Sequence, residues 1–283
     1  MYYLLYGFLY LVSLLPFCII YLLSDGAFFV VYRIIKYRRA IVTQNLDIAF
    51  PEKTTEEKKR IAKKFYHNLC DTFFESIKLL SMSSKQLSKR FSADYSLLHH
   101  IYNQGKSCQI HLGHNFNWEW GNAHISLSTK FNFLGVYMPI ENKSIDRFFK
   151  KLRSKFGTHL LAANNMRNAM LPYRDKQYTL ALIADQNPSN LSKAYWVDFF
   201  GKQTPFLIVP EKNARRINLP VVFATIKKIK RGYYQCIFKM LAENPIDTKE
   251  TEITTLFVRN TEKYIKNQPE NWLWSHRRWK HVK

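Results

Sequence analysis

A histidine and a glutamate that could act together as a base lie just after an apolar stretch of the chain. The stretch SCQIHL (107–112) is followed by GHNFNWEW, which places His114 and Glu119 five residues apart. Residues five apart in one helix lie about 140° from alignment. The two side chains can therefore meet only if His114 lies in the turn before a helix and Glu119 reaches back from its first turns. The carboxylate would then orient one imidazole nitrogen and leave the other free as a general base.

A base of this kind activates a hydroxyl group for attack on a carbonyl carbon. The start of the neighbouring helix also offers backbone N–H groups to an anion. Spacing alone is a weak signal, because a loop histidine and a surface glutamate often fall this far apart by chance. Hydrolysis by an activated water is an alternative reaction, but the sequence has no G-x-S-x-G nucleophile elbow, which argues against a serine esterase.

Short β-rich runs alternate with helical patterns through the part of the chain that must position these residues. Six runs are typical of strands: 107–112, 131–137, 158–163, 178–184, 220–226 and 233–240. Four patterns are typical of helices: 118–127, 144–156, 166–173 and 251–266. The alternation predicts an α/β fold with a mixed, mostly parallel central sheet flanked by helices, in which the last two strands form a hairpin.

Sites in open α/β sheets form at the carboxyl ends of the strands. His114 follows the run at 107–112, and Asp185 directly follows the run at 178–184. Both are therefore candidate site residues. We expect Trp118 and Trp120 to pack beneath the turn rather than to touch a substrate.

A long helix is predicted over residues 54–80. Thr54 and Glu57 have the spacing of a capping box at its start. Apolar residues recur at every fourth position as one stripe, formed by Ile61, Phe65, Leu69, Phe73 and Ile77. We expect this stripe to pack into the core.

The amino terminus has the composition of a membrane anchor. Its first 24 residues carry no charge, and a stretch of this length can span a bilayer. They lack the basic start and the cleavage site of a secretory signal. Pro16 interrupts them, and a second apolar run (27–32) leads into a basic flank typical of the cytoplasmic side. We predict an anchor over 1–40 and a single α/β domain over 41–283. One spanning helix, a bent pair of helices in one leaflet and a buried helix of a soluble core are the alternatives.

The chain is strongly basic, with 43 Lys and Arg against 21 Asp and Glu and a formal net charge of +22. Such a surface attracts nucleic acid, anionic lipid or acidic protein, and charge alone does not choose among them. Beside an apolar amino terminus, the basic tail SHRRWKHVK (275–283) favours anionic head groups or an acidic carrier protein over nucleic acid. The four cysteines lie far apart without a CxxC pair, which is typical of buried free thiols in a reducing compartment.

The string HNFNWEW (114–120) resembles the H-x4-D/E motif, commonly H-x-G-N-W-E, of the late lipid A biosynthesis acyltransferases of the lauroyl or myristoyl type. These belong to the lysophospholipid acyltransferase superfamily. Six further segments resemble the family's other signatures and fall in the same order: 37–52, 137–157, ALIADQNPS (181–189), VDFFGKQTP (197–205), LPVVFA (219–224) and PENWLWSHRRWK (269–280). The resemblance covers nearly the whole chain.

This resemblance implies a glycerolipid-acyltransferase-like fold and an enzyme on the cytoplasmic face of a bacterial inner membrane. The enzyme would move a fatty acyl chain from acyl carrier protein to a hydroxyl of a lipid A precursor. No metal or organic cofactor is implied, because the thioester already carries the activation.

The resemblance also assigns roles to individual residues. His114 would be the general base and Glu119 would fix its imidazole. Arg153 would stabilise an oxyanion or a phosphate, because guanidinium binds such groups with two hydrogen bonds. Asp185, followed by Gln186, would position Arg153 or the acceptor. Two further cations, Arg167 and Lys202, are weaker candidates for phosphate contacts.

Two departures from the family pattern bear on the acceptor. Phe116 occupies the position of the usual glycine in H-x-G-N-W-E, and Met138 occupies the position of a usual arginine. They keep open the same chemistry on a lysophospholipid, a glycolipid or an aminolipid. A basic binding protein without enzyme activity would explain the charge, but it would not explain why His114, Glu119 and Asp185 all fall at strand ends.

Overall fold

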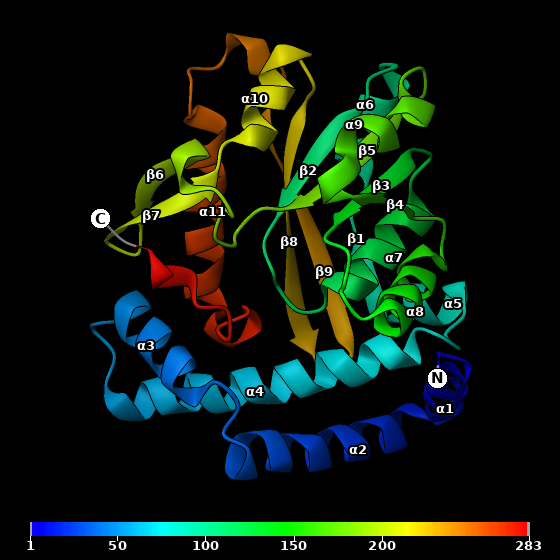
Figure 1. The fold of residues 1–283 in the computed structure, drawn as a ribbon, viewed down its shortest axis with the longest axis vertical. Helices are drawn as coiled ribbons and strands as arrows, with labels where there is room; N and C mark the ends of the chain where they lie inside the picture. The colour runs from blue at the N-terminus through cyan, green and yellow to red at the C-terminus, as the bar shows by residue number, and fades with distance from the viewer. Residues whose placement is uncertain (1, 282–283) are drawn as a thin grey trace.

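The computed structural model describes residues 2–281, and a mixed seven-stranded sheet forms its centre (Figure 1). The strands are β1 (Phe91–Ala93), β2 (Cys108–Leu112), β3 (Asn132–Tyr137), β4 (His159–Ala162), β5 (Tyr178–Ile183), β8 (Val221–Lys230) and β9 (Tyr233–Ala242). Their order in the sheet is β1-β9-β8-β2-β5-β3-β4, and every pairing is parallel except the β8–β9 hairpin. A separate antiparallel pair is formed by β6 (Ala194–Phe199) and β7 (Lys202–Leu207).

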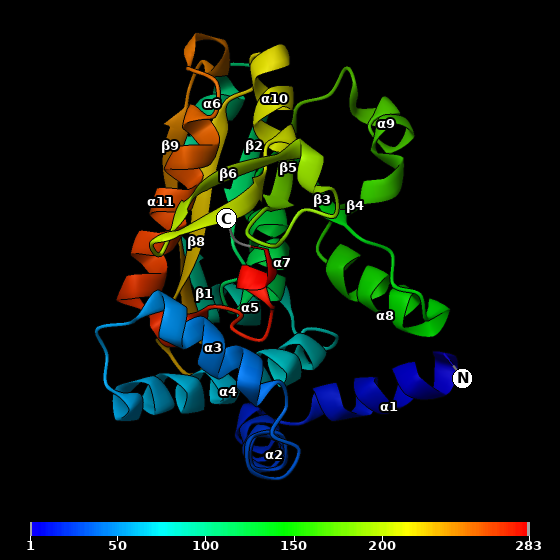
Figure 2. The same cartoon turned by 60° about the vertical axis from the view of Figure 1, so that its left-hand side comes forward.

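Helices cover both faces of the sheet because its central strands bury side chains on both sides. Along β8, Val222 and Ala224 pack into one apolar cluster while Phe223, between them, packs into another. The first cluster includes α5 (Ser84–Arg90), α6 (Ser96–Asn103), α7 (Trp118–Ser128) and α8 (Lys143–Ser154). The second includes α3 (Arg39–Ala49), α4 (Thr55–Lys78) and α11 (Glu252–Asn267). Figure 2 shows α11 and α8 on opposite sides of the sheet.

The register of two central strands positions the candidate site. β2 and β5 are parallel neighbours in which Leu112 pairs with Ile183. Each strand ends at that pair, so the chain leaves the sheet at the same level on both. His114 and Asp185 therefore lie beside one another, each two residues beyond the end of its strand.

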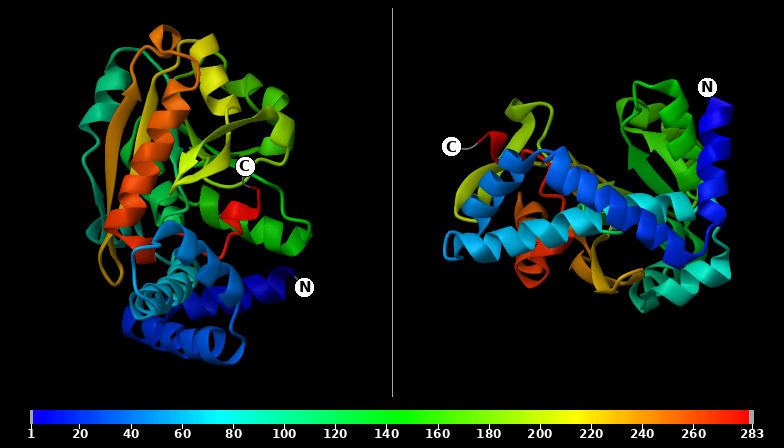
Figure 3. Two further views of the ribbon diagram at one scale, coloured as in Figure 1. Left: turned by 90° about the vertical axis from the view of Figure 1, so that its left-hand side faces the viewer. Right: turned by 90° about the horizontal axis from the view of Figure 1, so that it is seen from below.

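The apolar amino terminus forms two helices, α1 (Tyr2–Leu14) and α2 (Phe17–Phe29), separated at Pro16. Proline lacks a backbone N–H and cannot continue the helix, and α1 turns sharply away from α2 at this point (Figure 3). A π-helical turn, Val30–Ile34, extends α2. The segment Phe17–Ile34 is long and apolar enough to cross a membrane by length and composition, and only 11% of it is buried.

Both helices pack on α4, as does the turn between them. The buried ammonium of Lys78 donates hydrogen bonds to the carbonyl oxygens of Ser13 at 2.7 Å and of Leu15 at 2.8 Å. These carbonyls lie at the end of α1, where the last C=O groups of a helix have no N–H partner within the helix. The apolar amino terminus is thus bonded to the domain.

The predicted fold class is confirmed, and all six predicted strands and the hairpin are present. The capping box of Thr54 and Glu57 is confirmed at the start of α4. The predicted helix at 166–173 is instead a single α-helical turn, α9 (Met166–Ala169), flanked by 3-10 turns. The elements that the sequence patterns did not predict are α3, β1, α5, α6, the β6–β7 pair and α10 (Val209–Arg216).

Two expectations about burial are wrong. Phe73 of the predicted apolar stripe is exposed, while Asp71 and Glu75 on the same helix are buried beneath α2 and the β8–β9 hairpin. Cys18 is exposed, because it lies on the outer side of α2, whereas the other three free thiols are buried. Lys283, the last cation of the basic tail, lies outside the described residues.

Candidate active site

The site begins with a carboxylate–imidazole pair. The Nδ1 atom of His114 lies 2.5 Å from Oδ1 of Asp185, and the backbone N–H of His114 donates to Oδ2 at 2.8 Å. The side chain of Asp185 is 1% exposed and that of His114 is 18% exposed. The pair therefore has a buried carboxylate and an imidazole that reaches the surface.

Gln186 defines the protonation pattern of the imidazole. Its side-chain Nε2 lies 3.1 Å from Nε2 of His114 and donates a hydrogen bond to it. That ring nitrogen accepts, so Nδ1 carries the hydrogen that is shared with Asp185. The lone pair on Nε2 is thus directed away from Asp185 and toward the partly exposed side of the ring.

The surroundings of Asp185 keep it ionised. Its Oδ2 also accepts a hydrogen bond from the indole Nε1 of buried Trp272 at 2.7 Å. Burial alone would raise the pKa of the Asp185 carboxyl, but the His114 imidazole, which can become a cation, and these hydrogen bonds hold the pKa below its usual range. Gly113 allows the close approach, because a Cβ atom there would lie 2.9 Å from Oδ2 of Asp185.

A second charged pair lies beside the first. Nε of Arg153 donates to both carboxylate oxygens of Glu119 at 3.0 and 3.1 Å, and Nη2 donates to Oε1 at 2.6 Å. Glu119 is 4% exposed and Arg153 is 24% exposed at the side chain. Burial lowers the pKa of the Arg153 guanidinium, but Glu119 more than offsets this, so the pKa is raised and the cation is retained.

The tertiary structure fixes this second pair from two helices. Glu119 lies in the first turn of α7, and Arg153 lies in the last turn of α8. Asn122 of α7 donates to the carbonyl oxygen of Arg153 at 3.0 Å, which holds the end of α8 against α7. Among residues 2–281, Nη1 of Arg153 has no hydrogen-bond partner, so it can receive an anion.

Trp118 joins the two pairs. Its ring lies edge-on to the imidazole of His114, with centroids 5.5 Å apart, and its Nε1 donates to Oε1 of Glu119 at 3.2 Å. Trp120 is fully buried, as predicted, whereas Trp118 is partly exposed and contacts the His114 imidazole directly. Phe116, at the position of the family's glycine, is buried and stacks on Phe65 with centroids 5.9 Å apart.

The predicted partners of the two carboxylates are exchanged. We expected Glu119 to orient His114 and Asp185 to position Arg153 or the acceptor. In the structure Asp185 is bonded to His114, and Glu119 is bonded to Arg153. The reason is geometric: Glu119 points from α7 toward α8, while His114 precedes the helix and faces the end of β5.

The two weaker candidates lie apart from these pairs. Arg167 is exposed on α9, and Lys202 is exposed at the start of β7. Within residues 2–281, neither makes a hydrogen bond or an ion pair with His114, Asp185, Glu119 or Arg153. No three His, Cys, Asp or Glu side chains of the described chain gather as a metal site would require.

The carboxyl-terminal segment contributes residues that the sequence reasoning did not single out. Besides Trp272, Asn271 pairs with Phe116: its side chain donates to the Phe116 carbonyl at 2.9 Å, and its carbonyl accepts from Phe116 N at 3.1 Å. Asn271 and Trp272 both belong to PENWLWSHRRWK (269–280), a segment whose resemblance to the family signature assigns no role to them. The segment therefore holds the loop after β2 through the bonds of Asn271 to Phe116 and of Trp272 to Asp185.

One cation of the predicted basic tail is not available to a membrane or a carrier protein. Arg278 is fully buried and donates to Asn187 Oδ1 at 2.6 Å and to the Pro205 carbonyl at 2.8 Å. Burial lowers its pKa to about 9. Arg278 therefore holds the segment that follows Asp185.

Comparisons with known proteins identify the family of the chain. A family model described as bacterial lipid A biosynthesis acyltransferase matches residues 1–281. A lipid A biosynthesis lauroyltransferase from Escherichia coli (strain K12) is 22% identical over 279 residues, which cover 97% of this chain and 89% of the relative. The match runs through every element described above.

Proposed function

Because the chain belongs to the bacterial lipid A biosynthesis acyltransferase family, we propose that it moves a fatty acyl chain from an acyl thioester to a hydroxyl of a lipid A precursor. The observation that carries this proposal is the orientation of His114. Its Nδ1 is bonded to a buried carboxylate and its Nε2 accepts a hydrogen bond, so a proton acceptor is held at a partly exposed position.

The reaction follows from that orientation. Nε2 of His114 takes the proton of the acceptor hydroxyl, whose oxygen forms a bond to the thioester carbonyl carbon. The tetrahedral intermediate then breaks its carbon–sulfur bond, and His114 returns the proton to the leaving thiolate. Asp185 stabilises the imidazolium between these two steps. The hydroxyl donates to Nε2 of His114 from the side on which the Gln186 amide N–H₂ lies.

Arg153 supplies the positive charge. Its guanidinium is fixed by Glu119 and retains Nη1 for an anion. It would stabilise the oxyanion of the intermediate or a phosphate of the acceptor. Arg167 and Lys202 are proposed only as outer contacts for acceptor phosphates, because they lie apart from the two charged pairs.

The proposed donor is acyl carrier protein. A basic protein with a net charge of +22 attracts an acidic carrier. The sequence and the site are equally compatible with coenzyme A as the thiol, so the assay described below uses both.

The proposed location is the cytoplasmic face of a bacterial inner membrane, with residues 1–40 as the anchor and 41–283 as the catalytic domain. Exposed apolar side chains gather on α1, α2 and the π-helical turn: Tyr3, Leu4, Phe8, Leu11, Leu14, Ile19, Leu22, Leu23, Phe29, Val30 and Ile34. A groove of about 560 Å³ beside Phe28 is lined by the cations Lys53, Arg60, Lys63 and Lys64, which outnumber its two acids, Glu57 and Glu270. Apolar helices beside a basic groove suit an anionic lipid surface better than nucleic acid.

The same chemistry on another lipid acceptor is the second candidate. Phe116 fills the space below the loop, and Met138, which replaces a usual cation, is exposed. Fewer cations around the acceptor favour a head group with less phosphate than lipid A precursors carry.

The test is transfer of a labelled acyl chain from acyl carrier protein, or from coenzyme A, to a lipid A precursor in membranes. His114→Ala should lower the rate at least about 100-fold, since general-base catalysis contributes about 10²–10⁴. His100→Ala is the control, because His100 is exposed on α6 and its side chain, within residues 2–281, is bonded only to Gln104.

Equal product from wild type and His114→Ala would remove His114 from the mechanism. Product from wild type only on a lysophospholipid, glycolipid or aminolipid would replace the acceptor and leave the mechanism intact. Wild type without product on any acceptor would contradict the proposed function.

A further inference from the structure

A second buried carboxylate contacts the same loop from the opposite side. Glu75 lies on α4 and is fully buried. Its Oε1 accepts a hydrogen bond from the Tyr21 hydroxyl at 2.9 Å, and its Oε2 accepts from Asn117 Nδ2 at 2.9 Å and from the Tyr234 hydroxyl at 2.7 Å. Glu75 therefore joins three segments: α2, the loop before α7 and strand β9.

The bond to Asn117 reaches the proposed active site. Asn117 is the N-cap of α7, where its Oδ1 accepts a hydrogen bond from the backbone N–H of Trp120 at 3.1 Å. The indole of Trp120 in turn donates to the carbonyl oxygen of Glu75 at 2.9 Å. Both ends of the Asn117 amide are thus held. Glu119 lies between the two anchored residues, and His114 lies three residues before Asn117.

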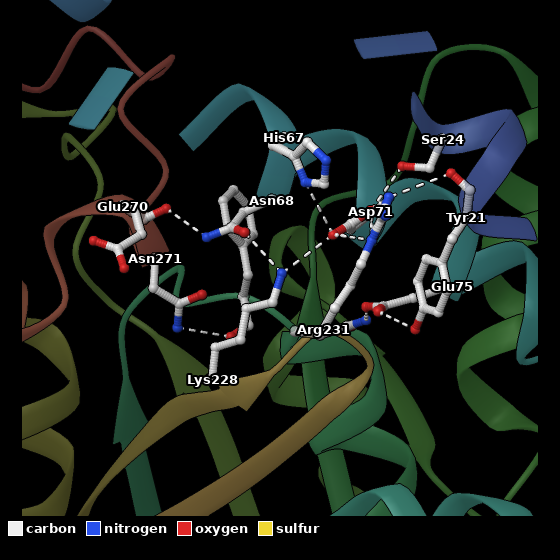
Figure 4. Close-up of polar contacts among 12 residues, drawn as sticks. Tyr21, Ser24, His67, Asn68, Asp71, Glu75, Lys228, Arg231, Glu270 and Asn271 are labelled. Carbon is white, nitrogen blue, oxygen red and sulfur yellow. Dashed lines mark hydrogen bonds and ion pairs between the residues drawn. The ribbon is translucent and has the colours of Figure 1, made fainter. Parts of the chain in front are cut away.

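The bond to Tyr21 reaches the apolar amino terminus. Tyr21 lies on α2, and its neighbour Ser24 donates to Asp71 of α4 at 2.8 Å. Figure 4 shows Tyr21 and Ser24 facing the α4 carboxylates. The polar side of α2 is therefore seated on α4, while its opposite side is the exposed apolar surface described above.

An ion-pair network strengthens the contact between α2 and α4. The guanidinium of Arg231, at the β8–β9 turn, donates to Asp71 at 2.7 Å and to Asp25 of α2 at 2.6 Å. Lys228 of β8 adds a bond to Asp71 at 3.2 Å (Figure 4). Asp71 and Glu75 are one helical turn apart on α4, so the network and the Tyr21 bond act on the same face.

We propose that Glu75 is a positioning residue that couples the packing of α2 on α4 to the position of the loop before α7, and so to the positions of His114 and Glu119. The effect on catalysis rests on the proposed function, whereas the effect on the loop does not. When α2 is displaced, Glu75 loses the Tyr21 bond, and Asn117 loses the fixed acceptor that holds the α7 N-cap. The proposed site is thus fully ordered only while the amino-terminal helix is seated.

Three variants of the full chain in membranes or detergent test this proposal. Tyr21→Phe removes only the link between α2 and Glu75. Glu75→Gln places an amide N–H₂ group opposite one of the three donors, so at least one bond is lost. Tyr234→Phe is the matched control, because it removes a hydroxyl from the same carboxylate but releases only β9, which carries none of the proposed catalytic residues.

The first measurement is hydrogen–deuterium exchange of residues 113–121, which requires no substrate. Faster exchange in Tyr21→Phe and Glu75→Gln, with Tyr234→Phe near wild type, supports the proposal. Wild-type exchange in both test variants would overturn it. Equal acceleration in Tyr234→Phe would also overturn it, since the link to α2 would then have no special effect.

The second measurement is kcat and KM for acyl transfer. Small displacements of catalytic groups cost up to about 100-fold, so we expect kcat to fall about 10-fold in Glu75→Gln and less in Tyr21→Phe, with KM unchanged. A lower melting temperature without loss of kcat would reduce Glu75 to a structural role and overturn the proposal. Absence of transfer by the wild type contradicts the proposed function alone, because the exchange data still decide whether Glu75 positions the loop.

Discussion

Asp185 and Glu75 are two buried carboxylates that hold one loop from opposite ends, and their electrostatics differ. Asp185 is bonded to His114 at the start of the loop, and Glu75 is bonded to Asn117 at its end. Each accepts three hydrogen bonds, and each is almost completely shielded from solvent. The pKa of Asp185 is nevertheless lowered, while that of Glu75 is raised.

The partners account for this difference. Burial raises the pKa of both groups, because it penalises the charged form. At Asp185 an imidazole that can become a cation, together with two N–H donors, outweighs burial. At Glu75 the hydrogen-bond partners are two neutral hydroxyls and an amide, and burial outweighs both these bonds and the charge of nearby Lys228, while Asp71 adds a smaller repulsion. Two equally buried carboxylates therefore differ in the direction of their pKa shift, and the difference follows from whether a partner in direct contact can become a cation.

The largest expected effect is on Asp185. Asp185→Asn keeps the size of the side chain but cannot stabilise an imidazolium, so kcat should fall about 10²–10⁴-fold. In Glu75→Gln, kcat should fall far less. A direct comparison of kcat for the two variants in the same membranes measures this difference. Equal losses would mean that Asp185 only positions the loop, as Glu75 does.

Glu119, in the first turn of α7, is a third buried carboxylate near this loop, and its contribution to stability should also depend on its partner. Arg153→Met leaves the buried Glu119 charge unpaired, so we expect a loss of at most about 3 kcal/mol in the free energy of unfolding, since Arg153 is partly exposed. It should also lower kcat about 10–100-fold through loss of anion stabilisation.

The double variant Glu119→Gln/Arg153→Met separates these two effects. It should regain most of the lost stability in urea unfolding, because no unpaired charge remains, but none of the lost activity. Recovery of activity would contradict a role for Arg153 in catalysis.

The next effect concerns the support of Asp185. Trp272→Phe removes the indole bond to Oδ2 of Asp185, and we expect kcat to fall about 10-fold, which corresponds to about 1.4 kcal/mol. Trp274→Phe is the control, because Trp274 is equally buried in the same cluster but donates to the Pro269 carbonyl. If both variants lose the same activity, the loss reflects packing rather than the bond to Asp185.

The sequence predicted the sheet and the candidate residues better than their partners. Strands and hairpin follow from local apolar runs, and the site follows from strand ends. Whether Asp185 meets His114 depends on β2 and β5 being neighbours in register, which no local pattern encodes. Glu75 was missed for a related reason: it lies two residues from Phe73 and from Ile77, about 200° around the helix from the predicted apolar stripe. Its burial depends on α2, Asn117 and Tyr234 folding over it.

The smallest expected effect is on the pH dependence of stability, where the two carboxylates should behave in opposite ways. Because the folded pKa of Asp185 is below its ordinary value of 3.8, its stabilising contribution is present above pH 3.8 and is lost as pH falls through the folded pKa. Because the folded pKa of Glu75 is above its ordinary value of 4.5, its contribution is present below pH 4.5 and is lost as pH rises through the folded pKa.

Urea unfolding of wild type, Asp185→Asn and Glu75→Gln from acidic to neutral pH measures both contributions. The stability difference between wild type and Glu75→Gln should shrink as pH rises from 4.5, whereas the difference for Asp185→Asn should shrink only below pH 3.8. A Glu75→Gln difference that stays constant above pH 4.5 would show that Glu75 is ionised in the folded protein. In that case the two carboxylates would differ in their partners but not in their charge, and the Tyr21, Tyr234 and Asn117 donors would suffice to hold a buried anion beside Asp71.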